Sequence, residues 1–542
     1  MTKLANFVFR SSLAIAIIFN IVAVGRAKAE DVNDFDELKD AITNEKKNII
    51  NVKQDIPFTN EIVINRSNLT ISGPSKDVAG LLYGGGNHKL LTFGENAKNI
   101  SLKNLHFEGG HDNRPRFIDG ETNPEAGGGA INLRKGTEAI LENITFSNSQ
   151  TATDGGAICS RGIDNNRNSL TFGGLATFKN NSSAGEGGAI YGGNETKLTF
   201  GGDVTFTENS SDGHGGAIRS SGENAADINI LKFEGNANFV GNSTTKGGFG
   251  NGGAISVVNS SLTFGGLATF RGNSSGSNGG AIYGGDRTKL IFGGEVIFTE
   301  NSSDGHGGAI RSWGENAVDI NILKFEGNAN FVGNSTTKGG FGNGGAISVE
   351  NSSLTFGGLA TFKNNRSAGQ GGVIYGRIGT ELIFGGDVIF TENSSDGDGG
   401  AIRSLGENAT NKNILKFEGN AIFVGNSATE GNNGYGGAIY AENSSLTFGG
   451  LATFENNRAR NGGAIFASDG SSIEFRDGLR LIENTTGNTD SGALHMWGNS
   501  NGKLATITIV QKNPLVPTEF RGNTSGNGGH NAVFMQYYSQ LN

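Results

Sequence analysis

The sequence predicts an all-β protein that folds as a parallel β-helix, a solenoid whose coils stack along one axis. Three observations predict it. The tetrapeptide Gly-Gly-Ala-Ile recurs along the chain, Phe-x-x-Asn motifs alternate with it, and there are 91 glycines but only 6 prolines among 542 residues. Such a repeat is typical of stacked copies of one small unit, and abundant glycine without proline indicates tight turns rather than a collagen-like or proline-rich chain.

The spacing between the tetrapeptides itself repeats with a second, longer period. From Gly187 the tetrapeptides follow at intervals of 28, 37 and 27 residues, and the series then starts again. Residues 170–261 and 262–353 differ at only 13 of 92 positions, and a looser third copy runs to about Ser445. Each 92-residue superrepeat therefore holds three coils, and a coil of about 28 residues has room for three short strands.

Short apolar or alternating segments fill each coil. Residues 197–200 and 204–206 have the composition of strands, and Gly201-Gly202 separates them. The repeats have no helical periodicity, whereas ankyrin and tetratricopeptide units need helices and leucine-rich repeats need a leucine ladder. A parallel β-helix is the architecture that remains.

The motif residues are expected to build the scaffold. Each motif Ile and Phe points inward and stacks on its counterpart about 4.8 Å away in the next coil. The paired glycines allow positive φ or a close backbone approach at a corner. The Asn occupies a turn, where its amide bonds its own backbone and the next Asn of a ladder. In the first superrepeat these residues are Phe178, Asn181, Gly187, Gly188, Ile190, Phe206, Asn209, Gly215, Gly216, Ile218, Phe239 and Asn242.

A cap precedes the repeats. Residues 34–44 predict a short amphipathic helix that starts with the capping pair Asp34 and Glu37. Its apolar face consists of Phe35, Leu38, Ala41 and Ile42. A solenoid needs such a cap to cover the core of its first coil. We therefore expect the cap and first coils at 30–89 and the repeats at 90–542, with the 92-residue superrepeats within 170–445.

Residues 1–29 are predicted to be a cleaved secretion signal. A basic start precedes an apolar run at 11–25, and the small residues Ala27 and Ala29 mark a cleavage site after Ala29. The alternative is an uncleaved membrane anchor, but the run is shorter than the ~20 residues that a spanning helix needs. Cleavage would move the formal net charge from −9 to −13. This acidic balance argues against nucleic acid as a partner.

No residue is expected to be catalytic, and no metal or cofactor is expected. One phase of the repeat carries acidic and histidine residues: Asp212, His214, Asp304, His306, Asp396 and Asp398. Catalysis needs a single asymmetric constellation, so we interpret these as turn residues and leave calcium binding at Asp-Gly turns open. Cys159 is the only cysteine, and a structural thiol is favoured over a reactive one.

The repeated Gly-Gly-Ala-Ile with Phe-x-x-Asn resembles the chlamydial polymorphic outer membrane proteins over residues 90–531, and the cap resembles the start of pectate-lyase-like β-helices. The resemblance implies a right-handed parallel β-helix displayed on the bacterial surface as an autotransporter passenger and adhesin. The family usually carries a C-terminal translocator barrel of about eight to twelve strands. We expect none here, because only a degenerate coil, a short strand and Phe520-x-x-Asn follow Asn484. The chain is then a truncated member, a passenger with a separately encoded barrel, or a freely secreted protein.

Binding is expected where loops lengthen one coil of each superrepeat, at 220–229, 312–321 and 404–413, because such insertions map to one face of a solenoid. Within these loops one position is occupied by Ser221, Trp313 and Leu405. We expect them to be adhesive contacts at loop tips; alternatively, they fold back on the coil wall. The expected partner is a host cell-surface protein or glycan. A polysaccharide lyase or hydrolase and an inert surface spacer are the alternative functions.

Overall fold

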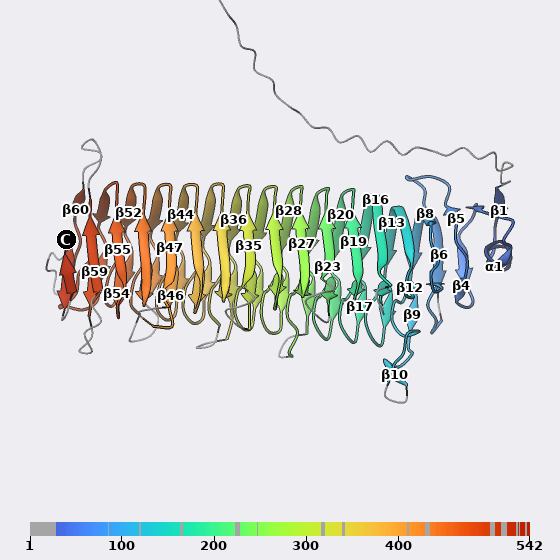
Figure 1. Cartoon of the computed structure of the whole chain (residues 1–542), viewed down its shortest axis with the longest axis horizontal. Coiled ribbons are helices and arrows are strands. Elements are labelled where there is room, and N and C mark those ends of the chain that lie inside the picture. The colour runs from blue at the N-terminus through green and yellow to red at the C-terminus, as the bar shows by residue number, and fades with distance from the viewer. Residues whose placement is uncertain are drawn as a thin grey trace, which may run out of the picture.

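The chain folds as one long solenoid of parallel strands. The computed structural model describes residues 29–541 apart from gaps at 85, 119–120, 163–165, 223–227, 246–247, 316–319, 339–341, 409–410, 429–433, 499–504, 511–517, 527–528, 530–531 and 537–538. Coils stack side by side from helix α1 (Phe35–Thr43) at one end to the C-terminal strands at the other (Figure 1). The predicted parallel β-helix is confirmed, with α1 the single helix among the described residues.

Each coil contributes strands to three sheets in a fixed order: two to sheet A, a two-residue strand to sheet C, and one to sheet B. These sheets have 31, 13 and 16 strands, respectively. The second superrepeat contains β27 (Ser260–Phe264), β28 (Ala268–Arg271), β29 (Ser274–Ser275), β30 (Ile282–Gly284), β31 (Lys289–Phe292), β32 (Val296–Thr299), β33 (Ser302–Ser303), β34 (Ile310–Trp313), β35 (Asn321–Phe325), β36 (Ala329–Val332), β37 (Ser335–Thr336) and β38 (Ile347–Glu350). Equal motif positions are in register, so Ile282 pairs with Ile310.

Sheet B runs the length of the stack. Its other strands are β4 (Ile62–Ile64), β7 (Leu91–Phe93), β12 (Ile131–Leu133), β15 (Ile158–Ser160), β18 (Ile190–Gly192), β22 (Ile218–Ser221), β26 (Ile255–Val258), β42 (Ile374–Arg377), β46 (Ile402–Leu405), β50 (Ile439–Glu442), β54 (Ile465–Ser468), β58 (Leu494–Trp497) and β61 (Val533–Gln536). Sheet A begins beside α1 with β1 (Glu30–Val32), β2 (Ile49–Val52), β5 (Leu69–Ser72), β6 (Gly80–Gly84), β8 (Ile100–Glu108), β13 (Glu138–Ser147) and β16 (Asn168–Lys179).

Helix α1 lies at the start of the stack with its apolar face buried. Phe35 packs edge-on against Phe58, with the ring centroids 5.4 Å apart. At the helix N-terminus Asp34 accepts the Glu37 N–H at 2.9 Å, and the Glu37 carboxylate accepts the Asn33 N–H at 2.8 Å. This reciprocal pair satisfies N–H groups that have no partner within the helix.

The predicted signal peptide lies outside the described residues except for Ala29. Cleavage after Ala29 therefore stays a prediction. The boundary between cap and repeats at residue 89 also stays a prediction, because strand pairing continues across it from β5 through β8 to β13.

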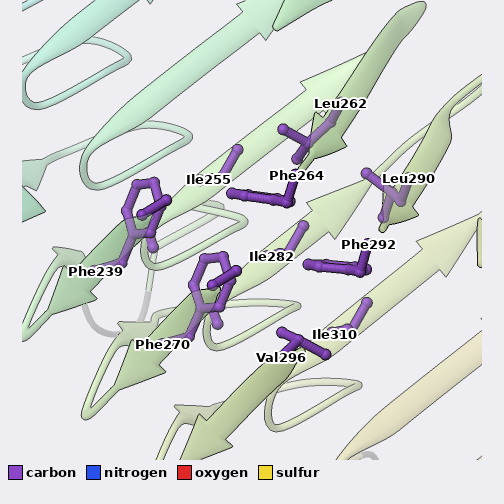
Figure 2. Packing of buried hydrophobic residues seen from close by; sticks show 14 of the residues in the cluster. Phe239, Ile255, Leu262, Phe264, Phe270, Ile282, Leu290, Phe292, Val296 and Ile310 are labelled. Atoms are coloured by element: carbon purple, nitrogen blue, oxygen red, sulfur yellow. The ribbon is translucent and has the colours of Figure 1, made fainter. Parts of the chain in front are cut away.

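Columns of like side chains fill the interior. The rings of Phe239 and Phe270 stack nearly parallel, as do those of Phe264 and Phe292, with centroid distances of 4.9 and 5.0 Å (Figure 2). The two columns meet edge to face, as between Phe264 and Phe270 at 5.7 Å and 87°. These are the arrangements that the ring quadrupole favours. Ile282 of sheet B projects into the same interior.

The predicted inward residues occupy this core. Phe178, Phe206, Phe239, Ile190 and Ile218 are all fully buried. Burying one such side chain contributes roughly 1.5–3 kcal/mol. Each additional coil therefore adds a similar increment of hydrophobic stabilisation.

The two glycines of each tetrapeptide meet different requirements. The first has positive φ, +68° at Gly187 and +71° at Gly215, a conformation that favours glycine. The second lacks space, because a Cβ on Gly188 would lie 2.0 Å from the Gly216 carbonyl oxygen. The two reasons that the sequence suggested for the pair thus apply to different positions.

The motif asparagines form a ladder between coils. Asn301 Nδ2 donates to Asn334 Oδ1 at 2.9 Å and to the Phe270 carbonyl at 3.0 Å. Asn301 Oδ1 accepts the backbone and side-chain N–H groups of Asn273 at 3.0 and 2.9 Å. Asn181, Asn209 and Asn242 bond in the same way. The described bonds run to neighbouring coils, whereas the sequence analysis also expected bonds to the residue's own backbone.

The residue before each ladder asparagine has a left-handed backbone. Its φ is +54° at Asn180 and Glu208, +60° at Gly272 and +55° at Glu300. Asparagine and glycine adopt this conformation readily, whereas glutamate does so under strain. The turn therefore depends on this residue, and not on the asparagine alone as the motif had suggested.

We expect Asn301→Ala to destabilise the protein by about 3 kcal/mol or more. The change leaves the Phe270 carbonyl and two N–H groups of Asn273 without these partners, and each buried unpaired group costs about 1–3 kcal/mol. Chemical denaturation measures the loss. Asn238→Ala, at a half-buried outward position of sheet A, should cost less than about 0.5 kcal/mol. Equal losses in the two variants would contradict the importance of the ladder.

We expect Glu300→Gly to stabilise the protein by about 1 kcal/mol, because it relieves left-handed strain at a position where other coils have glycine. Thermal unfolding measures the gain. Glu300→Ala removes the same carboxylate but keeps a Cβ. If the alanine variant gained as much stability, charge rather than backbone strain would be the cause.

Candidate binding site on sheet B

Ser221, Trp313 and Leu405 are not at loop tips. Each is the last residue of its sheet B strand and each is half-buried. Strand pairing extends to these residues, as between Trp313 and Glu350, which holds them on the coil wall. Because Ile310 faces the core and successive residues alternate, Trp313 faces outward. The expectation of loop tips is therefore wrong, and the alternative placement on the coil wall is correct.

These residues belong to one outward-facing column at the end of the sheet B strands, which we call the outer column. Its members are Ser221, Val258, Trp313, Glu350, Arg377, Leu405, Glu442, Ser468 and Trp497. From Trp313 to Trp497 each member is in register with the next.

Trp497 was missed by the sequence analysis. It lies 92 residues beyond Leu405 and is 39% exposed. The sequence after the third superrepeat is degenerate around Trp497, but the 92-residue period alone could have found it. Both tryptophans of the chain therefore occupy this column.

A second column lies beside the outer column on the same face. We call it the tyrosine–arginine column, and its members are Tyr191, Arg219, Ser256, Tyr283, Arg311, Ser348, Tyr375, Arg403, Tyr440, Phe466 and His495. Although these residues face away from the core, Arg311 is only 7% exposed and Arg403 5%. The chain's own side chains largely fill this part of the face.

Each arginine of this column is held by polar groups. Arg311 donates to Ser348 Oγ at 2.7 Å and to Glu350 at 2.8 Å. Arg403 donates to Glu442 at 2.9 Å, and its guanidinium carbon lies 3.6 Å from the centre of the Tyr440 ring. Buried charges need such partners.

Two of the differences between the first two superrepeats are linked by this requirement. In the first copy, Arg219 donates to Ser221 Oγ at 3.2 Å and the next coil carries Val258. In the second copy, Trp313 cannot accept such a bond, and Glu350 in place of the valine accepts it. Trp313 and Leu405 are therefore each accompanied by a carboxylate in the following coil, Glu350 and Glu442, that accepts the bond from the arginine.

The residues that precede the paired glycines are structural acceptors. His214 Nδ1 accepts a backbone N–H of the next coil at 3.1 Å, His306 Nδ1 does so at 3.3 Å and Asp398 at 3.1 Å. Asp212 and Asp304 accept threonine hydroxyls of the next coil at 2.7 and 2.8 Å. These contacts repeat from one superrepeat to the next, as expected of turn residues.

Asp396 forms an ion pair with Arg366 at 2.8 Å. Among the residues that the structure describes, no group of three or more His, Cys, Asp or Glu side chains is arranged to hold a metal ion.

One charged cluster does not follow the repeat. Fully buried Lys89 donates to the carbonyls of Glu125 and Gly127 at 2.5 and 2.9 Å and pairs with Asp112 at 3.7 Å. Burial lowers its pKa to about 8. Because the ammonium group contacts three partners, the cluster links the segment that contains Asp112, Glu125 and Gly127 to the strand region at Lys89. Cys159 is buried nearby, and burial raises the pKa of its thiol.

The longest coil of a superrepeat contains a second insertion, between β25 (Ser243–Thr244) and β26, where Phe249 is 92% exposed. The hairpin of β10 (Phe117–Ile118) and β11 (Glu121–Thr122) projects from the corresponding turn of an earlier coil (Figure 1). The sequence analysis had assigned all the extra length of the 37-residue interval to residues 220–229.

The structure is a parallel β-solenoid with two outward-facing side-chain columns, and comparison with known families agrees with this fold. Residues 29–157 match the pectate lyase-like adhesive domain. The Chlamydia polymorphic membrane protein repeat matches residues 176–193, 203–221, 268–285, 295–312, 360–377, 387–404 and 452–468. The chain thus carries repeats of this type, and the resemblance seen in its motifs is confirmed. No curated protein and no solved structure was found to match it. Within the described residues, no helix has the length and apolar character needed to cross a bilayer.

We expect the free energy of unfolding to decrease as the pH is lowered from 6.5 to 4, and we expect His306 to contribute to this decrease. Burial of the imidazole, and secondly the nearby Arg311 guanidinium, lowers the pKa of His306 from its ordinary value of about 6.5 to about 4. The unfolded chain therefore takes up the proton first, so the contribution of neutral His306 is complete above about pH 6.5 and is lost as the pH falls toward 4.

His306→Asn tests this assignment, because it keeps an acceptor at a position where the preceding coil has Asn278. The variant should show a shallower fall in Tm between pH 7 and 4 than the unchanged protein. The same slope in both would contradict a role for His306.

Proposed function

We propose that the chain is a secreted β-solenoid passenger, displayed on the bacterial surface, that adheres to host cells through the outer column of sheet B. The matches to an adhesive domain and to Chlamydia polymorphic membrane protein repeats support a surface passenger. Export would begin with the predicted signal peptide. A translocator would hold the passenger at the outer membrane, and the partner would be a host protein or glycan.

The composition of the outer column is the observation that carries this proposal. Superrepeats that are otherwise closely similar place serine, tryptophan and leucine at one outward position, while the inward Phe and Ile positions stay the same. Large apolar side chains are typical anchors of interfaces. Their repetition along the axis would add weak contacts into one stronger attachment.

A binding role fits this face better than catalysis. The histidines and aspartates that precede the paired glycines accept backbone N–H groups of the next coil. The ammonium group of Lys89 is likewise engaged: it donates hydrogen bonds to two carbonyls and forms an ion pair with a carboxylate. Acid–base catalysis needs such groups within reach of a substrate. We therefore propose a non-catalytic role.

We expect the double variant Trp313→Ser and Leu405→Ser to bind cultured epithelial cells at least about tenfold more weakly, because each substitution removes a proposed anchor. Labelled purified protein measures saturable binding. Serine occupies the equivalent position at Ser221, so both changes should preserve the fold. Leu359→Ser is the matched control, since Leu359 is 41% exposed beside sheet A and should not affect binding.

If the unchanged protein shows no saturable binding, the adhesive function is wrong and an inert spacer or a polysaccharide-active enzyme is the better account. Release of new sugar chain ends from a polysaccharide would favour the enzyme. Equal loss of binding with the Leu359 control would place the contacts elsewhere.

A further inference from the structure

We propose that the outer column binds a neutral glycan chain laid along the solenoid axis, with subsites at Trp313, Leu405 and Trp497. This inference rests on the adhesive function proposed above and names the class of ligand. Three features support it: the position of the tryptophans, the polar groups between them, and the balance of charge along the column.

The tryptophans provide apolar platforms at one repeated position. Trp313 is half-buried at the end of β34, and Trp497 is 39% exposed at the end of β58. The Trp497 ring meets the Phe466 ring edge-on, with the centroids 6.1 Å apart at 78°. An indole face accepts the apolar C–H face of a pyranose ring, and the indole N–H can donate to a hydroxyl.

Planar hydrogen-bonding groups follow the first platform. Glu350 is in register with Trp313 in the next coil and accepts bonds from Arg311 at 2.8 Å and Arg377 at 3.3 Å. The Arg377 side chain is 47% exposed, so it can reach a ligand. Carboxylate and guanidinium groups bind pairs of neighbouring polar atoms, such as the adjacent hydroxyls of a sugar.

A related arrangement follows three coils later. Glu442 is in register with Leu405 and accepts bonds from Arg403 at 2.9 Å and the Tyr440 hydroxyl at 3.3 Å. Ser468 then leads to Trp497. Apolar platforms therefore alternate with polar groups, which matches the alternation of ring faces and hydroxyl edges along a sugar chain.

The charges along this stretch cancel. Arg311, Arg377 and Arg403 lie among Glu350, Glu442 and Asp398, and the closest pairs are 2.8 to 4.0 Å apart. The whole chain carries a formal net charge of −9. A polyanionic glycan would meet net repulsion, whereas a neutral chain loses nothing to the overall charge.

The spacing favours an extended ligand. Subsites three coils apart are separated by about 14 Å, and Trp313 and Trp497 by about 29 Å. A single sugar cannot span this distance, so an oligosaccharide is needed to engage more than one subsite. Linked contacts would then strengthen one another.

Intrinsic fluorescence tests the proposal directly, because both tryptophans of the chain are in the proposed site. Oligosaccharides released from the epithelial cells are separated by anion exchange into neutral and acidic fractions and titrated into the purified full chain. We expect a saturable change in tryptophan emission with the neutral fraction. Leu405→Ser keeps both reporters and should weaken this binding roughly tenfold, whereas Leu359→Ser should not.

The cell assay separates failure of the inference from failure of the adhesive function. Cell binding that survives enzymatic deglycosylation but is removed by mild proteolysis would indicate a protein receptor and overturn only the glycan proposal. A fluorescence response to the acidic fraction alone would also overturn it. Absence of both cell binding and a response to the neutral fraction would contradict both proposals.

Discussion

The structure depends on one constraint, the in-register parallel pairing of each coil with the next. Ile282 and Ile310 pair because each coil returns the backbone to the same place after a complete turn. Once the backbones are in register, a side chain must fit against a near-copy of itself about 4.8 Å away. Phenylalanine rings can stack in parallel at this spacing. The repetition of the sequence is therefore a packing requirement as well as a trace of duplication.

The asparagine ladder applies the same constraint to polar groups. A buried amide such as Asn301 is satisfied only when the coils on both sides supply matching partners. The described chain has a single cysteine, which is buried and free, so the coils are linked by this ladder and not by disulfides. It also requires a left-handed residue before the asparagine, which is why glycine, asparagine and strained Glu300 share that position.

Because the inward Phe and Ile positions are fixed, variation falls in the turns and on the outward face. Even there it is not free, since a buried arginine must keep its hydrogen-bond partners. Ser221 satisfies Arg219 directly, whereas Trp313 occurs together with Glu350, which satisfies Arg311. As long as each buried arginine keeps its hydrogen-bond partners, the scaffold stays intact. The apolar residues of the outer column can then differ from one superrepeat to the next. This is a physical basis for functional variation on a repetitive fold.

The sequence by itself determined the β-helix, the buried Phe and Ile columns and the capping helix, because these follow from short motifs and periodicity that are local in the chain. Only the tertiary structure decided where the outward residues lie. The sequence predicted a loop tip for Trp313 and carried no signal for the cluster of Lys89 with Asp112. Such positions depend on how far strand pairing extends and on contacts between distant residues, which local patterns do not encode.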